Sequence, residues 1–110
     1  MKGSREAALR FDMMLLPKQR QFLKGLAHSL SPVVRVGKGG LTAAVVDETK
    51  KSLLAHELIK VRIDVEDGPA RREMAQELAR AADAEVAGTI GKLAILYRAR
   101  DEKPKIKPPR

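Results

Sequence analysis

Apolar residues recur at helical spacing in the first third of the chain, at Phe22, Leu23, Leu26, Ala27 and Leu30. Pro17 suits a first helical turn and Pro32 forbids continuation, so these positions predict a helix over residues 17–30. A short β-branched run follows and ends before Gly37; it consists of Val33, Val34 and Val36. Such a run is typical of a strand.

The helical period returns beyond a glycine-rich segment, at Val45, Val46, Thr49 and Leu53. These positions predict a second helix over residues 42–56, with Thr42 as its N-cap. From Ile59 to Val65, apolar residues alternate with polar ones, which predicts a strand with one buried and one polar face. A third helix is predicted to begin at Pro69, and residues 86–90 and 93–98 predict two strands joined by a tight turn.

The predicted order is helix, strand, helix, strand, helix, strand, strand. A helical connection makes the first two strands parallel, and the tight turn makes the last pair antiparallel. The fold class is therefore α/β, a small mixed four-stranded sheet with three helices. A chain of 110 residues fits one domain, which we place at residues 17–98. We expect residues 1–16 to be a mobile extension and residues 99–110, which hold little to bury, to be a disordered basic tail.

Composition excludes several classes of function. Aromatic residues make up only 3% of the chain, so the sheet lacks the stacking platform of many single-strand binders. The absence of cysteine excludes disulfides, thiolate catalysis and cysteine-ligated zinc. No apolar run is long enough to span a bilayer, so we expect a soluble, cytoplasmic protein with no membrane partner.

The formal net charge of +8 is unevenly distributed along the chain. Residues 17–62 hold nine basic and three acidic side chains, whereas residues 63–97 hold four basic and seven acidic ones. Residues 98–110 are basic again, with six basic and two acidic side chains. This segregation favours a polyanionic partner over an evenly solvated surface.

The segment between the first strand and the second helix has the residue types of a phosphate site: Arg35, Gly37, Lys38, Gly39, Gly40 and Thr42. Glycines let the backbone approach a ligand, and the start of the next helix offers unpaired N–H groups and a positive dipole end. GxxG loops of KH domains clamp a nucleotide backbone in this way. By spacing alone the segment could equally be a plain turn, and it matches neither a P-loop nor a dinucleotide fingerprint.

Several linked motifs occur in the order and spacing of the CRM domain: Leu26-Ala27-His28, Val36-Gly37-Lys38-Gly39-Gly40-Leu41-Thr42, His56-Glu57-Leu58-Ile59-Lys60-Val61, Ile90-Gly91-Lys92 and Leu96-Tyr97-Arg98. Over residues 17–98 the chain resembles this family, also called YhbY-like. The resemblance implies a non-catalytic RNA-binding module whose sheet and GxxG loop look like the C-terminal domain of bacterial translation initiation factor three. It also implies ribosomal RNA as the partner, in precursors of the large ribosomal subunit, and contacts to RNA from residues 37–40.

Further basic residues could extend this surface: Lys18 and Lys24 on the first helix, and Lys60 and Arg62 on the polar face of the second strand. A solvated face is an equally good interpretation of the helix lysines. His28 and His56 fall near helix ends, where histidine is usually structural, and Asp64, Glu66 and Asp67 are typical of a solvated strand end and a helix cap. We therefore expect no catalytic residues, no metal and no cofactor.

Two other functions remain open. The first is non-specific binding of DNA, for which charge would suffice, although a loop-and-helix phosphate clamp fits irregular RNA better. The second is a protein-interaction module whose basic half meets an acidic partner. In the favoured interpretation the protein acts as a monomer, and its basic tail adds affinity for RNA without selectivity.

Overall fold

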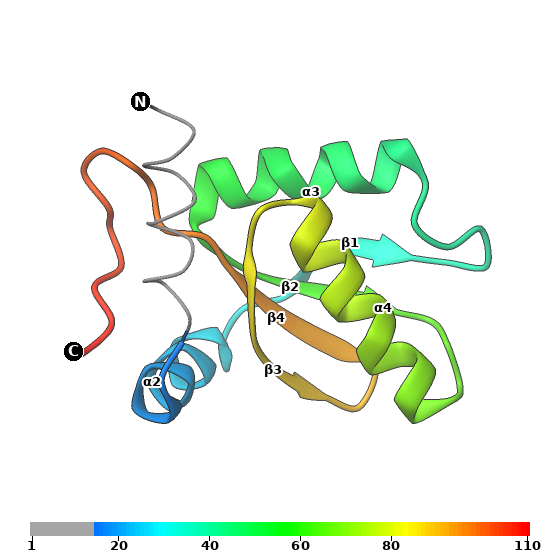
Figure 1. Cartoon of the computed structure of the whole chain (residues 1–110), viewed down its shortest axis with the longest axis horizontal. Coiled ribbons are helices and arrows are strands. Elements are labelled where there is room, and N and C mark those ends of the chain that lie inside the picture. Colours follow the sequence, from blue (N-terminus) through cyan, green and yellow to red (C-terminus); the bar gives the residue numbers. More distant parts are fainter. Residues whose placement is uncertain (1–14) are drawn as a thin grey trace.

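The computed structural model describes residues 15–110 and contains three helices and four strands in that part of the chain (Figure 1). The order is α2 (Pro17–Ala27), β1 (Pro32–Val36), α3 (Ala43–His56), β2 (Leu58–Ile63), α4 (Gly68–Ala81), β3 (Glu85–Ile90) and β4 (Leu93–Tyr97). This is the predicted order of helices and strands. Most of the proposed mobile extension, residues 1–14, lies outside the described residues.

The four strands form one mixed sheet in the order β1-β2-β4-β3. β1 and β2 are parallel and are connected through α3, whereas β4 pairs antiparallel with both β2 and β3. Both predicted strand relations are confirmed. β1 is an edge strand, and its register brings Arg35 opposite Arg62.

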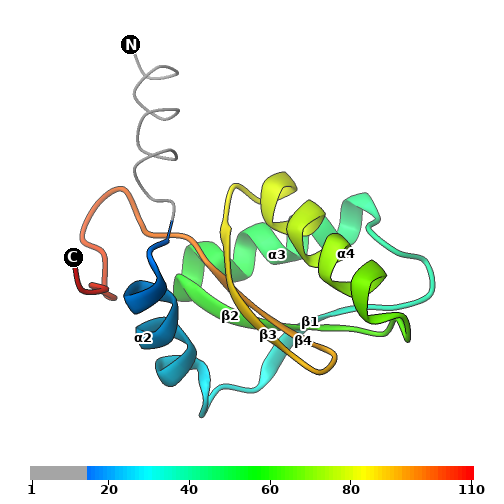
Figure 2. The same cartoon turned by 60° about the horizontal axis from the view of Figure 1, so that its bottom comes forward.

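Helices cover both faces of the sheet (Figure 2). On one face, α3 and α4 bury an aliphatic cluster that includes Val36, Leu53 and Leu78. On the other face, α2 packs a second cluster through Leu23 and Ala27 against β2, β3 and β4. Because α2 spans only 11 residues, it covers one end of its face and leaves the other end open.

The second cluster corrects two expectations. Leu15, assigned to the mobile extension, is buried in this cluster. The strand predicted to have one polar face is covered on that face too, because Leu58 and Lys60 lie buried on the side of α2. A sequence pattern shows which strand positions alternate, but it does not show that a helix elsewhere in the chain returns to cover the polar ones.

Helix α2 is three residues shorter than predicted and ends at Ala27, with His28 as its C-cap. The next residues form turns, in which Leu30 N donates to Ala27 O at 2.9 Å. The Lys60 ammonium donates hydrogen bonds to the carbonyl oxygens of His28 and Leu30, at 3.4 and 2.9 Å. These contacts end the helix before Pro32 is reached.

The C-terminal segment, residues 98–110, is anchored to the domain, which differs from the expectation of a disordered tail. The buried carboxylate of Glu57 accepts hydrogen bonds from the backbone N–H groups of Arg100, Lys105 and Ile106 at 2.7–3.0 Å. The Arg100 side chain donates to two carbonyl oxygens at the end of α3, and Ile106 packs on the second cluster. We call this segment the strap.

The strap and the loop between β1 and α3 lie at opposite ends of the molecule's long axis (Figure 1). The molecule measures 38 Å along that axis. None of the helices in the described part of the chain is long and apolar enough to cross a membrane.

Candidate nucleic-acid interface

The loop of residues 37–42, here the glycine loop, is built by short-range hydrogen bonds. Gly40 N donates to Gly37 O, and Thr42 N donates to Gly40 O, both at 3.1 Å. The Thr42 hydroxyl oxygen accepts from Val45 N at 3.2 Å, which confirms Thr42 as the N-cap of α3. The loop therefore delivers the chain directly to the positive end of a 14-residue helix.

The three glycines of the loop differ in whether the local structure requires a glycine. Gly40 has φ +74°, a conformation that favours glycine. A Cβ built on Gly37 would meet no atom within 4 Å, and one built on Gly39 would meet only Thr42 Cγ2, at 3.8 Å. Packing therefore does not require glycine at either position, and what their missing side chains provide is an open backbone beside the exposed Lys38.

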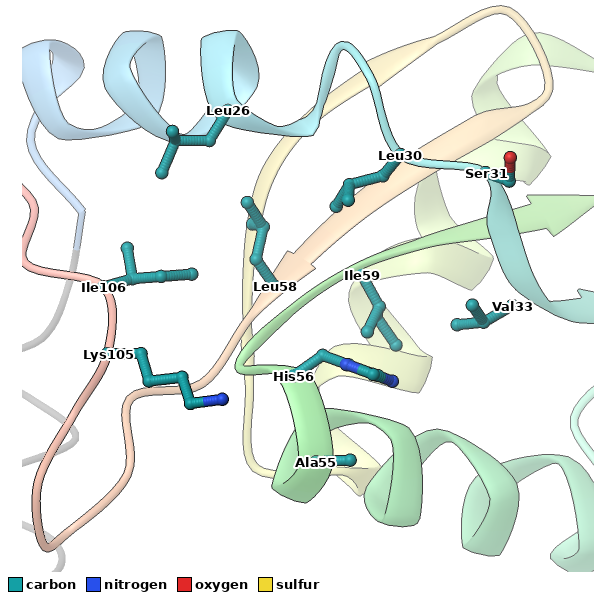
Figure 3. A pocket seen from close by; sticks show the side chains of 10 residues that line it. All are labelled: Leu26, Leu30, Ser31, Val33, Ala55, His56, Leu58, Ile59, Lys105 and Ile106. Carbon is teal, nitrogen blue, oxygen red and sulfur yellow. The ribbon is translucent and has the colours of Figure 1, made fainter.

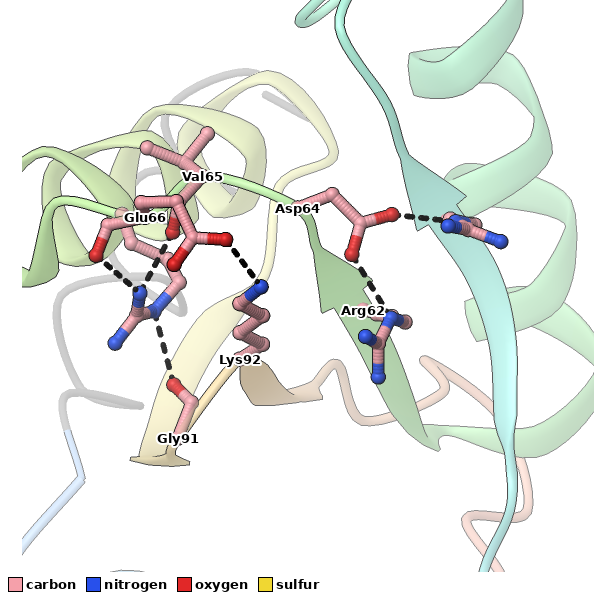
Figure 4. Close-up of polar contacts among 8 residues, drawn as sticks. Arg62, Asp64, Val65, Glu66, Gly91 and Lys92 are labelled. Carbon is pink, nitrogen blue, oxygen red and sulfur yellow. Dashed lines mark hydrogen bonds and ion pairs between the residues drawn. The ribbon is translucent and has the colours of Figure 1, made fainter.

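Arg35, two residues before the glycine loop, and its register partner Arg62 lie on the face of the sheet opposite the α3 and α4 cluster. Figure 4 shows Arg62 beside Asp64. Both guanidinium groups bind the carboxylate of Asp64, Arg35 Nε at 2.5 Å and Arg62 Nε at 2.9 Å. Hydrogen bonding from Arg35 and then from Arg62 lowers the pKa of Asp64 below its ordinary 3.8, and this effect exceeds the opposing effect of desolvation. The carboxylate is therefore ionised at neutral pH.

Two other cations lie at this end of the sheet, but their donors are already engaged (Figure 4). Lys92 Nζ binds the Glu66 carboxylate at 2.7 Å. This hydrogen bond is the main reason why the pKa of the Glu66 carboxyl is lowered. Arg71 donates to the carbonyl oxygens of Gly91, Val65 and Glu66, so it holds the turn between β3 and β4 against the end of β2. Arg71 therefore has a structural role.

The structure brings together part of the predicted site. Arg35 is the register partner of Arg62 and lies two residues before the glycine loop; we call the two arginines and the loop together the basic face. Lys60 does not belong to it, because its ammonium is buried against the end of α2. Lys18 and Lys24 belong to α2, and this helix lies toward the other end of the sheet (Figure 2). The aliphatic part of the Lys24 side chain lies over Gly88, where an added Cβ would stand 2.9 Å from Lys24 Cδ.

An apolar groove of about 530 Å³ lies away from the basic face, between the end of α2, the start of β1, the end of α3 and the strap (Figure 3). Leu26, Leu30, Val33, Leu58 and Ile106 form most of its walls, with His56 and Lys105 at its edge. Hydrocarbon walls offer no donors to a phosphate, so the groove is not part of the candidate interface.

The remaining candidates have structural positions. His28 caps α2 and His56 ends α3, as predicted. Tyr97 is buried, and this burial raises the pKa of its hydroxyl, with a further rise from the charge of Glu57. Asp67 caps α4 through Ala70 N at 2.9 Å. Within residues 15–110, no group of three or more acidic or histidine side chains could hold a metal ion.

Sequence reasoning missed two acidic residues. The sequence pattern indicates a solvated strand end at Asp64, but the side chain binds Arg62. The signal in the sequence is that the two residues are two positions apart in a strand and so share one face. Glu57 occupies the end of α3 with φ +66°, where glycine is the usual residue. A charged residue at such a position was the available signal that its side chain has a partner.

Comparison with known proteins agrees with this geometry. The CRS1/YhbY (CRM) domain model matches residues 15–98. A Haemophilus influenzae protein named RNA-binding protein is 44% identical over 88 residues, which cover 80% of this chain and 89% of the relative. YqeI of Bacillus subtilis, named a probable RNA-binding protein, is 33% identical and is matched over its whole length and 87% of this chain.

A solved structure shows the same fold. The solution structure of a Staphylococcus aureus protein matches with a TM-score of 0.79 and 32% identity, over 87% of this chain and all of the other. Residues 15–98, which the family model matches, contain all three helices and all four strands of the described part of the chain. The chain therefore belongs to the CRS1/YhbY (CRM) domain family.

Proposed function

We propose that the protein binds RNA through its phosphate backbone at the basic face and assists assembly of the large ribosomal subunit. The single observation that carries the proposal is the glycine loop. Its Gly37 and Gly39 are not required by packing, its Lys38 is exposed, and it ends at the N-terminus of α3. Open backbone N–H groups, an ammonium and a helix dipole suit a phosphodiester.

Three further facts support this function. The relatives named above are described as RNA-binding proteins, and the family is not enzymatic. The two guanidinium groups of Arg35 and Arg62 extend the positive surface beside the loop. Tyr97 is buried, so it is not exposed to stack on bases, and recognition of the phosphate backbone fits better than readout of base identity.

The function is tested by measuring affinity for single-stranded ribosomal RNA and duplex DNA at several salt concentrations. If about four to six phosphates are neutralised, the slope of log K against log salt on single strands should be about −3 to −4. Lys38→Glu should lower RNA affinity roughly tenfold or more, because it places a carboxylate against a phosphate. Lys107→Glu, the same charge change on the strap, is the matched control. It should have a much smaller effect, because the strap lies at the opposite end of the molecule and adds only non-specific attraction.

The results separate the alternatives. Preference for duplex DNA at equal salt would support a general DNA-binding protein instead. Equal effects of Lys38→Glu and Lys107→Glu, with both variants folded, would show that the glycine loop is only a turn. For the ribosomal role, the protein should co-sediment with large-subunit precursors, and ribonuclease should abolish this; persistence after ribonuclease would favour a protein partner.

A further inference from the structure

Arg35, Arg62 and Asp64 form a three-residue arrangement on the basic face, here the arginine fork. Arg35 and Arg62 are register partners on adjacent parallel strands, so their side chains leave the sheet side by side on the same face. Asp64 follows Arg62 at the next position on that face, and its backbone N–H donates to Val36 O at 2.9 Å. The backbone thus fixes the carboxylate beside both guanidinium groups.

The two contacts use only one nitrogen of each arginine. Asp64 Oδ2 accepts from Arg35 Nε, and Asp64 Oδ1 accepts from Arg62 Nε. In the described part of the chain, the terminal Nη groups of Arg35 and Arg62 make no hydrogen bond to the protein. The side chains are 71% and 44% exposed, against 19% for Asp64. The carboxylate therefore lies beneath, and the donor ends of both guanidinium groups face outward.

This arrangement differs from the neighbouring ion pair. Lys92 and Glu66 pair one cation with one anion, so the pair carries no net charge, and the Glu66 side chain is 90% exposed. In the arginine fork two cations share one anion, and a net positive charge remains. An isolated pair on a surface contributes little to stability, so the effect of Asp64 lies in orienting the arginines.

We propose that Asp64 is a positioning residue that holds Arg35 and Arg62 as a clamp for one phosphodiester group of the bound RNA. The inference deepens the proposed function and rests on it. Planar guanidinium groups bind phosphate oxygens with paired hydrogen bonds, and holding them in place lowers the entropy lost on binding. Arg35 stands three residues before Lys38, at most about 11 Å of extended chain, so the clamp and the glycine loop contact neighbouring phosphates.

The test is the substitution Asp64→Asn, for which an effect of charge and an effect of orientation change RNA affinity in opposite directions. Asp64→Asn removes a negative charge from a protein of net charge +8, so charge alone predicts tighter RNA binding. Orientation predicts the reverse, a roughly fivefold to tenfold loss with a salt slope shallower by about 0.7. Glu66→Gln is the matched control: it also removes an acid at this sheet end, and it frees Lys92, so affinity should stay equal or rise.

A second variant keeps the proposal testable if Asp64→Asn lowers the melting temperature. Arg62→Lys retains the charge but loses the planar donor pair, so it should weaken RNA binding several-fold. Binding as tight as wild type in Arg62→Lys, or tighter binding in a folded Asp64→Asn, would overturn the clamp while leaving the effect of Lys38→Glu in place. Failure of the wild-type protein to bind RNA in the same titration would overturn the proposed function itself.

Discussion

Glu57 offers the sharpest test of how the strap is held. Its carboxylate is fully buried and accepts three backbone N–H groups, from Arg100, Lys105 and Ile106, at 2.7–3.0 Å. Its backbone has φ +66°, which an L-residue adopts only at a cost. The side chain therefore compensates for a local conformation that glycine would adopt more easily.

The expected effect of Glu57→Ala follows from these contacts. Hydrogen bonds to a charged acceptor contribute roughly 1.5–3 kcal/mol each. The full sum is not lost, because the strap can detach, its amides then reach water, and the freed chain regains conformational entropy. We expect the free energy of unfolding to fall by about 2–4 kcal/mol, a decrease in Tm of roughly 10–25 °C for a domain of this size.

Two further variants should lose less stability than Glu57→Ala. The free energy of unfolding and Tm are measured by urea and thermal denaturation followed by circular dichroism. Glu57→Gln keeps one acceptor oxygen but turns an NH₂ group toward the remaining donor, so its loss should be about half as large. Glu57→Gly should be less destabilising than Glu57→Ala by about 1 kcal/mol, because glycine relieves the positive φ.

A double-mutant cycle gives the result that would refute this reasoning. Glu57→Ala in a chain that lacks residues 99–110 should cost much less than in the full chain, because both changes remove the same contacts. Equal costs in the two backgrounds would show that Glu57 does not hold the strap.

Three further outcomes are expected. Deleting residues 99–110 should lower Tm by about as much as Glu57→Ala. An unchanged Tm would instead support the expectation that this segment is disordered. Lys60→Met leaves two carbonyl oxygens at the end of α2 without their donor; it should cost about 1–3 kcal/mol of stability yet change RNA affinity far less than Lys38→Glu. Because the pKa of Tyr97 is raised in the folded state, the unfolded chain ionises first, so the contribution of Tyr97 to stability should be fully present below pH 10.0 and be lost as the pH rises through its folded pKa. Comparing Tyr97→Phe with wild type at pH 9 and 11 checks this, and identical declines would exclude Tyr97 as the cause.

The sequence predicted the helix and strand order because the apolar positions follow clear periods, with prolines and glycines at the boundaries. It also predicted Thr42 as a cap, because that interaction is local. Lys60 was misplaced for the opposite reason. Its partners are the carbonyl oxygens of His28 and Leu30, about 30 residues earlier, and nothing in the local alternation indicates them.

The same distinction explains the strap and the arginine fork. Composition indicates correctly that residues 99–110 cannot form a core of their own, but their stability comes from Glu57, more than 40 residues away. Asp64 and Arg62 share a face by simple alternation, whereas the contribution of Arg35 depends on the register between β1 and β2. Long-range pairing decides both, and a single sequence does not reveal it.

The central claim is that RNA binds at the basic face. It is tested most directly by following the backbone amides of isotope-labelled protein in nuclear magnetic resonance spectra during titration with a single-stranded ribosomal RNA segment. We predict that the largest shift changes fall on residues 35–44 and 62–64, and that α4 and the apolar groove change little. Changes concentrated on α4, on the groove or on the strap, with the glycine loop unaffected, would contradict the account.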